Sequence, residues 1–297
     1  MTMKEKLKEI LLSKKFQVAA VITLAIVLTA VITYLISYTS LTRHAKDVVL
    51  VETKYEFPLL VNSHDEYQGK ALIEHGTYKE HLTPIIKKIV KNDGTCIDIG
   101  AGYGYHTVLM SKLAADGEVY SFEAIPNVYK LLRYSVNMNE IKNTKVFNNL
   151  LSSENTKSFL ETYPEYPTLS STIVSSKATH IKKDHYIEKN AEALDYLLPD
   201  LSDVSLIKID TNGSELAIIK GAKGIISRSP KLNIILRWNY KKFAYYGDIY
   251  PRLIDNFVNA KFEFWIINQD GSMKLITKDQ LLILENADVL ITKDYIG

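Results

Sequence analysis

The stretch TCIDIGAGYGYHTVLM, residues 95–110, decides how the rest of the chain is interpreted. Residues 95–99 form an apolar run of strand length, and Gly100, Gly102 and Gly104 follow at alternate positions. Glycine adopts backbone angles that other residues resist, and it lets a ligand approach the main chain closely. After the glycines the apolar residues are spaced as in a helix. This order predicts a strand, a tight turn and a helix, which together form the nucleotide-binding corner of an open α/β sheet.

The next predicted strand, at residues 118–122, is followed directly by an acidic side chain, Glu123. A carboxylate at that place can accept hydrogen bonds from both ribose hydroxyls of an adenosine. The spacing suits NAD and S-adenosylmethionine equally, but the dinucleotide fingerprint G-x-G-x-x-G needs a glycine where this chain has Tyr105. The order D-x-G-x-G-x-G, which begins at Asp98, instead resembles the first motif of S-adenosylmethionine-dependent methyltransferases.

Composition limits the classes of protein to consider. The chain has 297 residues, of which 46% are hydrophobic, and this allows one sizeable α/β domain with an appendage. The net charge of +2 gives no reason to expect a nucleic-acid partner. The single cysteine, Cys96, excludes a disulfide framework and a cysteine metal cluster, and we interpret it as a small buried apolar residue.

The N-terminal part of the chain predicts a membrane anchor. Residues 18–36 are almost wholly apolar, and no charged residue lies between Lys15 and Arg43. A run of about 20 apolar residues can span a bilayer, and no convincing cleavage site follows it. We therefore predict a basic segment at residues 1–16 and a retained single-pass anchor at residues 17–39. The lysines before the span favour a cytoplasmic N-terminus, which would put the following domain on the other side of the membrane. The cytosolic supply of S-adenosylmethionine favours the opposite orientation, and we expect the catalytic domain on the cytosolic side.

The remaining chain predicts alternating strands and helices. Residues 40–75 are mixed and polar and predict a tether, in which the cluster at residues 64–66 is interpreted as a solvated loop rather than a metal site. A helix is expected from Gly76 to about Lys91 and a short helix at residues 191–198. Further strands are expected at residues 145–149, 206–210, 232–236, 262–267 and 288–292, with a helix at 250–260. The closing pair of strands suits a methyltransferase sheet better than a dehydrogenase sheet.

Two features point to the acceptor side of the site. Residues 152–190 are a long excursion beside the cofactor corner, and they either shape an acceptor pocket or form a plain surface hairpin. Asp210 ends the strand expected beside the first one, so its carboxylate lies near the transferred group or simply caps the next helix.

Four segments together resemble the FkbM-type methyltransferase family: GTYKEHLT at 76–83, CIDIGAGYGYHT at 96–107, GEVYSFEAIPNVYKLL at 117–132 and LIKIDTNGSELAIIKGA at 206–222. They occur in the family's order and span most of the chain after the predicted anchor. The resemblance implies a Rossmann-like class I methyltransferase domain at residues 76–297 with a seven-stranded sheet. It also implies an S-adenosylmethionine site and methyl transfer, usually to a hydroxyl oxygen.

The resemblance also assigns residues. The positions that it and the predicted strand ends place at the cofactor are Asp98, Gly100, Ala101, Gly102, Tyr103, Gly104, Glu123, Ala124 and Asn149. Asp210 and Glu215 belong to the second family motif, D-x-E-G-x-E, whose middle acid is Asn212 here. The fifth strand ends in Arg237, where relatives usually have an acidic residue.

A hydroxyl acceptor must lose a proton, and we expect Asp210 to accept it, with His106 as the second candidate. The predicted function is a membrane-anchored O-methyltransferase acting on a sugar, lipid or polyketide-like acceptor, without a metal or a nucleic-acid partner. The alternatives are a catalytically decayed anchored binding or scaffold protein, which Asn212 supports, and a NAD-linked oxidoreductase, which Tyr105 disfavours.

Overall fold

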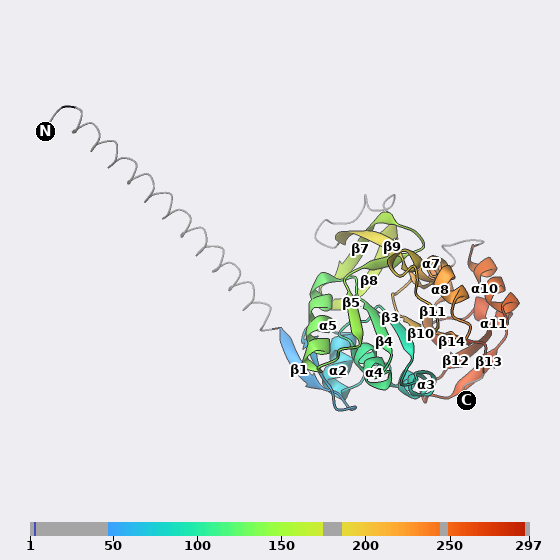
Figure 1. Ribbon diagram of the computed structural model, residues 1–297, viewed down its shortest axis with the longest axis horizontal. Coiled ribbons are helices and arrows are strands. Elements are labelled where there is room, and N and C mark those ends of the chain that lie inside the picture. Colours follow the sequence, from blue (N-terminus) through green and yellow to red (C-terminus); the bar gives the residue numbers. More distant parts are fainter. Residues whose placement is uncertain (1–2, 4–46, 175–185, 244–248, 295–297) are drawn as a thin grey trace. The chain divides into compact units, whose positions relative to one another are not determined.

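The computed structural model describes residues 3, 47–174, 186–243 and 249–294 (Figure 1). The chain divides into a first unit, Met1–Val48, and a compact second unit, Val49–Gly297. The predicted basic segment at residues 1–16 and the predicted anchor at residues 17–39 lie outside the described residues, apart from Met3. Within the described ranges, no helix combines the length and the apolar character that a membrane span needs.

An eight-stranded sheet forms the centre of the second unit, in the order β13-β12-β14-β11-β10-β3-β4-β5 (Figure 1). Its strands are β3 (Thr95–Ile99), β4 (Glu118–Phe122), β5 (Thr144–Phe147), β10 (Val204–Ile209), β11 (Asn233–Trp238), β12 (Glu263–Ile267), β13 (Met273–Ile276) and β14 (Ala287–Thr292). The five strands β11, β10, β3, β4 and β5 run parallel, whereas β14 is antiparallel to β11 and to β12. The predicted closing pair is therefore confirmed.

The predicted number of seven strands is wrong, because β13 adds an eighth strand at the edge of the sheet. A turn at residues 268–272 reverses the chain, and β13 then pairs antiparallel with β12. Only Ile276 of this four-residue strand is buried. Such a short and largely exposed edge strand lacks the apolar pattern by which strands are found in a sequence.

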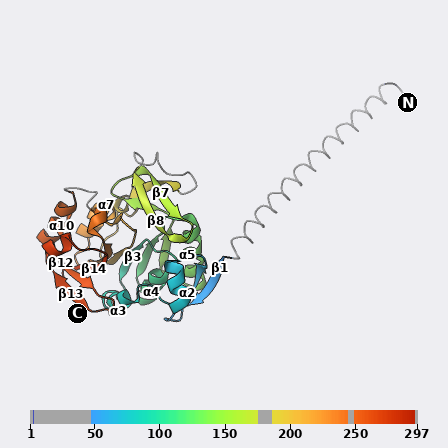
Figure 2. The ribbon, with the colours of Figure 1, turned by 180° about the vertical axis from the view of Figure 1, so that it is seen from behind.

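Helices cover both faces of the sheet (Figures 1 and 2). They are α2 (Gln68–His75), η1 (Glu80–Leu82), α3 (Thr83–Ile89), α4 (Tyr105–Leu113), α5 (Pro126–Met138), α6 (Leu194–Leu197), α7 (Glu215–Gly221), α8 (Lys223–Ser227), α9 (Tyr240–Phe243), α10 (Ile249–Asn259) and α11 (Lys278–Leu282). Successive residues of a strand point to opposite faces, so Cys96 packs into the core under α3 to α5 and Ile97 into the core under α7 and α10. The central strands are therefore buried on both faces.

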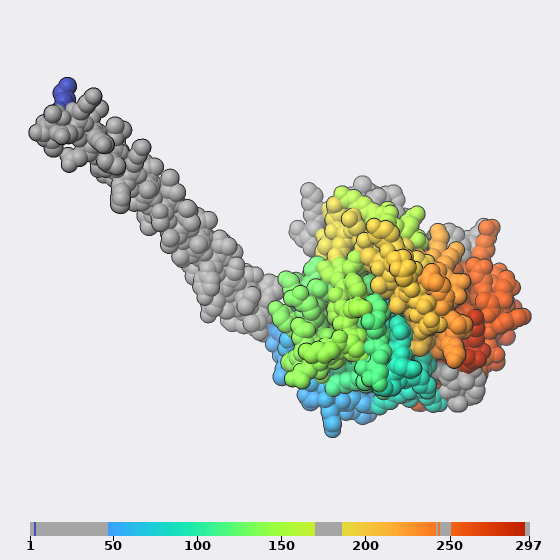
Figure 3. All heavy atoms as spheres, viewed as in Figure 1, coloured from blue at the N-terminus to red at the C-terminus, as the bar shows by residue number. Residues whose placement is uncertain are grey.

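Residues 49–75 of the predicted tether are folded onto the domain. They form β1 (Val48–Glu52) apart from its first residue, β2 (Pro58–Asn62) and α2, and Phe57, Leu59 and Val61 are fully buried. Figure 3 shows the blue atoms of this segment joined to the cyan and green atoms in one continuous surface. The prediction of a solvated loop at residues 64–66 is wrong for Asp65, which is buried and accepts hydrogen bonds from two backbone amides.

The prediction that a helix begins at Gly76 is also wrong. Gly76 instead ends α2, in a left-handed conformation with φ of 64°. A glycine just past a helix satisfies the last carbonyl groups at no steric cost, and here its N–H donates to Leu72. The chain then re-enters helical structure only at η1.

The excursion at residues 152–190 contributes most of a separate four-stranded sheet, in the order β6-β9-β7-β8. Its strands are β6 (Leu150–Ser152), β7 (Thr156–Tyr163), β8 (Tyr166–Val174) and β9 (Tyr186–Ala193). The helix predicted at residues 191–198 starts only at Leu194, because Ala191 to Ala193 pair with β6. Leu151 of β6, Leu160 of β7 and Thr168 of β8 line the same cavity as the residues that follow β3 and β4.

Candidate active site

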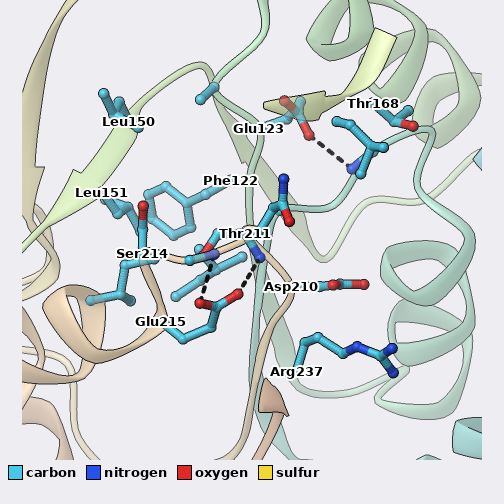
Figure 4. A pocket seen from close by; sticks show the side chains of 18 of the residues that line it. Phe122, Glu123, Leu150, Leu151, Thr168, Asp210, Thr211, Ser214, Glu215 and Arg237 are labelled. Carbon is cyan, nitrogen blue, oxygen red and sulfur yellow. Dashed lines mark hydrogen bonds between the residues drawn. The ribbon is translucent and has the colours of Figure 1, made fainter. Parts of the chain in front are cut away.

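A cavity of about 280 Å³ lies at the carboxyl ends of β3, β4, β10 and β11 (Figure 4). In an open α/β sheet this edge is where ligands bind. The predicted cofactor residues that line the cavity are Gly100, Gly102, Glu123, Ala124 and Asn149. Asp98, Ala101, Tyr103 and Gly104 belong to the same strand and turn, but they do not form part of the cavity wall.

Glu123 lies at the end of β4 with its carboxylate inside the cavity wall (Figure 4). One oxygen accepts a hydrogen bond from the Gly102 N–H at 2.9 Å and the other accepts one from the Ile125 N–H at 2.8 Å. Burial raises the pKa of Glu123 to about 7, although these amides favour the charged form. A carboxylate offers about four lone-pair positions, so acceptor capacity remains for a ligand's hydroxyl groups.

The glycine turn is shaped by close approaches that a side chain would block. Gly100 has φ of 72°, and a Cβ there would lie 2.1 Å from the carbonyl oxygen of Asp210. Gly102 has φ of 57°, and a Cβ there would lie 1.8 Å from Oε1 of Gln68. The same Oε1 accepts a hydrogen bond from the Tyr103 N–H at 3.1 Å. The turn is therefore held between α2 and the end of β10.

Gln68 was missed by the sequence analysis, because the tether prediction gave its segment no fixed place. Tyr105, by contrast, is fully buried, so it occupies the position of the third dinucleotide glycine with a bulky side chain. This supports the choice against a dinucleotide site.

Asp98 supports the turn from beneath. Its Oδ1 lies 2.9 Å from Nζ of Lys208 in the neighbouring strand β10, and its Oδ2 accepts a hydrogen bond from Thr107 at 2.7 Å. Both charged side chains are almost completely buried. The arrangement ties β3, β10 and α4 together, which fixes the positions of the glycine turn and of the end of β10.

Asp210 lies on the cavity wall beyond the end of β10. Its Oδ2 lies 2.8 Å from Nζ of Lys79 and accepts a hydrogen bond from the Tyr78 hydroxyl at 3.3 Å. Burial favours the neutral acid, but the positive charges of Lys79 and Lys208 outweigh it and hold the pKa of Asp210 well below its usual range. Among the described residues, no hydrogen bond is made to Oδ1, so this oxygen remains available to a ligand.

Asp288 of β14 extends this ion pair into a network. Lys79 also lies 3.2 Å from Asp288, whose other oxygen is 2.8 Å from Nε2 of His81 and 3.2 Å from the Arg237 guanidinium. A carboxylate only accepts hydrogen bonds here, so Nε2 of His81 carries the hydrogen. Lys79 adopts φ of 46°, an uncommon conformation for a residue with a side chain. The sequence analysis assigned no role to Lys79, His81 or Asp288, although the first two lie in a quoted family segment.

His106, the second candidate base, is buried and does not line the cavity. Burial, together with Lys208 and Lys79, lowers its pKa well below the usual value, so the ring is neutral. Its ring packs against the rings of Tyr78 and Tyr105, and Nε2 has no hydrogen-bond partner in the described structure.

The loop after Asp210 is organised by Glu215. Its carboxylate accepts hydrogen bonds from the Thr211 N–H at 3.1 Å and the Gly213 N–H at 2.9 Å, and burial raises its pKa to about 7 (Figure 4). Asn212, in place of the family's middle acid, has φ of 57° and lines the cavity. Glu215 thus shapes the wall without presenting its charge to a ligand.

The cavity is covered by two segments that are far apart in the sequence. Tyr67 and Gln68 line it from the N-terminal side, at the start of α2. From β7 and β8 it is lined by Leu160, Thr168 and Leu169. Thr168 donates a hydrogen bond to Asp65 at 2.7 Å, and the Glu66 N–H donates one to the Glu165 carbonyl at 3.0 Å. The excursion thus contains a hairpin of β7 and β8 that contributes to the cavity wall.

The residues present fit an adenosine-containing cofactor. Glu123 offers acceptors at the end of β4, Phe122 and Leu151 offer apolar surface, and the glycine turn leaves room that a Cβ would fill. Asn149 lines the cavity, with its amide nitrogen donating to Glu192. The fold and the cavity together define a Rossmann-like α/β domain with antiparallel closing strands and a cavity that suits a nucleotide cofactor.

Residues 98–264 match the methyltransferase FkbM domain, and the chain belongs to this family. The resemblance predicted from the four segments is therefore confirmed, and with it the S-adenosylmethionine cofactor of this family. A curated relative, "Methyltransferase 1" of Beauveria bassiana (strain ARSEF 2860), is 21% identical over 146 residues. That alignment covers 44% of this chain and 59% of the relative.

Solved structures of methyltransferases are also similar to this chain. Precorrin-6y C5,15-methyltransferase from Geobacter metallireducens GS-15 is 12% identical, with a TM-score of 0.40, over 72% of this chain and 89% of that chain. An rRNA methylase from Streptococcus thermophilus is also 12% identical, with a TM-score of 0.40, over 73% and 97%. P. horikoshii TYW2 in complex with MeSAdo is 10% identical, with a TM-score of 0.42, over 84% and 72%.

Proposed function

We propose that this protein transfers a methyl group from S-adenosylmethionine to a hydroxyl oxygen of a small acceptor. The observation that carries the proposal is that Glu123 and Asp210 line one cavity, with the glycine turn packed against the backbone of Asp210. A ribose held at Glu123 and a hydroxyl held at Asp210 would then share one enclosed space. Family membership supports the class of reaction.

The protein's part in this reaction is mainly to position the reactants. When bound, S-adenosylmethionine supplies a methyl group that its positively charged sulfur already activates. Asp210 accepts a hydrogen bond from the acceptor hydroxyl through Oδ1, while Lys79 and Tyr78 hold Oδ2. Holding two reactants in line can contribute about 7–11 kcal/mol to lowering a barrier.

The ion pair with Lys79 makes Asp210 a weak base before the reaction starts. The acceptor hydroxyl becomes strongly acidic only as its oxygen forms the new bond to carbon, and its proton then passes to Oδ1 of Asp210. His106 lies off the cavity wall and its Nε2 is buried, so the geometry favours Asp210 for this role.

Cofactor binding can be measured by calorimetry on the full chain in detergent. We expect S-adenosylmethionine to bind, and Glu123→Gln to weaken binding by about tenfold or more, because charge-assisted hydrogen bonds to the ribose are lost. Glu118→Gln is the matched control, since Glu118 begins the same strand but is exposed and paired with Lys145. Absence of binding, or equal loss in both variants, would contradict the proposal.

We further propose that residues 17–39 anchor the protein in a membrane with the catalytic domain on the cytosolic side. The uncharged apolar run between Lys15 and Arg43 supports the anchor, and the cytosolic source of the cofactor supports the orientation. Membrane fractions should retain the protein after extraction with alkaline carbonate. A protease added to intact cells should leave the domain intact, and its digestion would refute the orientation.

A decayed, purely binding role for the site is a separate candidate that Asn212 favours. The structure keeps the loop that this residue belongs to in place, because Glu215 still holds the amides on either side of it. Formation of S-adenosylhomocysteine with pooled sugar, lipid and polyketide hydroxyl acceptors separates the two functions. Cofactor binding without any turnover would favour the decayed protein.

A further inference from the structure

Arg237 lies at the carboxyl end of β11, on the wall of the cavity. About a third of its side chain is exposed, and Figure 4 shows its guanidinium extending toward the same side of the cavity as the Asp210 carboxylate. Its only bond within the described residues is the one from NH1 to Asp288, at 3.2 Å. A guanidinium has five N–H donors in a planar fork, so most of them remain available on a partly open wall.

Two asparagines continue this wall away from Asp210. Asn239 follows Arg237 by two residues, Asn286 precedes Asp288 by two, and both line the cavity. Arg237 pairs with Asp288 across the sheet, and the Asn239 amide donates to Asn286 at 2.8 Å. Asn239 directly follows the last residue of β11 and Asn286 directly precedes the first residue of β14, so the amide pair continues the paired strand ends. The charged pair and the amide pair therefore form one polar surface beside the site of methyl transfer.

Asp288 balances the charge of Arg237 but, within the described part of the chain, takes up only one of its nitrogen atoms, NH1. Asp288 already receives the shorter bond from His81, at 2.8 Å, and a second ionic contact from Lys79. Lys79 also pairs with Asp210 at 2.8 Å, so the carboxylate nearest the reaction is compensated without Arg237. The guanidinium is the most exposed cation of this network, since Lys79 is only 10% exposed.

We propose that Arg237 binds an oxyanion of the acceptor, a carboxylate or a phosphate, next to the hydroxyl that is methylated. The planar fork of arginine matches both groups with two parallel hydrogen bonds. Asn239 and Asn286 add polar surface to the cavity wall beside this guanidinium. The inference rests on the proposed methyltransferase function and specifies its acceptor as an anionic hydroxyl compound.

Matched pairs of compounds test this on the full chain with S-adenosylhomocysteine at saturation. Glucuronate and glucose differ by a carboxylate, and glucose 6-phosphate and glucose differ by a phosphate, so the two arms distinguish the sources of the oxyanion. Calorimetry should show at least one anionic member binding about tenfold tighter than glucose, as expected for charged hydrogen bonds. Arg237→Gln should abolish that preference, and Arg237→Lys, which keeps the charge but not the fork, should retain part of it.

Arg133→Gln is the control, because Arg133 is exposed on α5 and stacks over Tyr129 and Tyr134 instead. It should leave the preference unchanged. The inference is overturned if both members of each pair bind equally tightly, or if the anion preference survives Arg237→Gln. In either case, normal cofactor binding leaves the proposed function standing. Loss of S-adenosylhomocysteine binding by the unmodified protein overturns the proposed function itself. Unfolding temperatures measured in parallel show whether Arg237→Gln remains folded.

Discussion

Alanine substitutions at Gly100 and Gly102 should destabilise the fold to different extents, because the new Cβ atoms meet different neighbours. At Gly102 the new Cβ meets Oε1 of Gln68, the end of a flexible side chain, whereas at Gly100 it meets the backbone carbonyl of Asp210 at 2.1 Å. A left-handed conformation costs an alanine about 1–2 kcal/mol in either case. A side chain can rotate away, but the backbone of a buried turn cannot.

For Gly100→Ala, the carbonyl must retreat by about 1.3 Å to reach an ordinary contact of 3.4 Å. Overpacking of this kind costs about 1–3 kcal/mol, so the total loss of unfolding free energy is about 2–5 kcal/mol. The movement also separates Asp210 from the cofactor side. A misplacement of about 1 Å can reduce a rate about a hundredfold, so methyl transfer should fall further than stability alone would cause.

For Gly102→Ala, the loss is the backbone strain plus about 1 kcal/mol for the displaced bond between Gln68 and the Tyr103 N–H. Combining it with Gln68→Ala removes the obstacle, so the double variant should be about 1 kcal/mol more stable than the sum of the single effects predicts. Urea unfolding followed by circular dichroism measures all of these. The reasoning is refuted if Gln68→Ala rescues Gly100→Ala equally well, or if Gly100→Ala unfolds like the unmodified protein.

Four further predictions concern the charged residues. The pKa of Glu123 is raised to about 7, so lowering the pH from 8 to 6 should protonate it and weaken cofactor binding about tenfold; calorimetry of Glu123→Gln should show no such dependence. The pKa values of Glu123 and Glu215 are raised to about 7, so between about pH 4.5 and 7 the folded chain holds protons that the unfolded chain releases. The unfolding free energy should therefore fall as the pH rises through this range. Glu215→Gln should make that fall less steep. Lys208→Met leaves Asp98 buried and unpaired and should cost about 3–5 kcal/mol in urea unfolding, part of which Asp98→Asn should restore. Asp210→Asn should leave cofactor affinity unchanged and reduce S-adenosylhomocysteine formation about 10²–10⁴-fold; an unchanged rate would remove Asp210 from the mechanism.

The cofactor half of the site was largely predictable because its residues are close in the sequence. The glycine turn and Glu123 follow directly from two strands with clear apolar patterns, and the structure places Gly100, Gly102 and Glu123 on the cavity wall. Residues that directly follow a strand lie at its carboxyl end, so their place can be predicted from the local sequence. The closing strands were also visible, since β12 and β14 carry apolar runs.

The acceptor half needed tertiary structure. Lys79, Asp210, Arg237 and Asp288 come from four separate segments, and only the pairing of β14 beside β11 brings the last two into register. The contact between Gln68 of α2 and the glycine turn also depends on tertiary structure, because no local pattern in the sequence indicates it.

Strand, turn and helix signals act over a few residues, so they were enough to predict the class of fold, the family, and a glycine turn with Glu123 beside it. Tertiary structure alone decided which charges meet Asp210 and which guanidinium faces the acceptor. Ion pairs between distant segments depend on sheet order and register, and these are set by the packing of the whole domain rather than by any one stretch of chain.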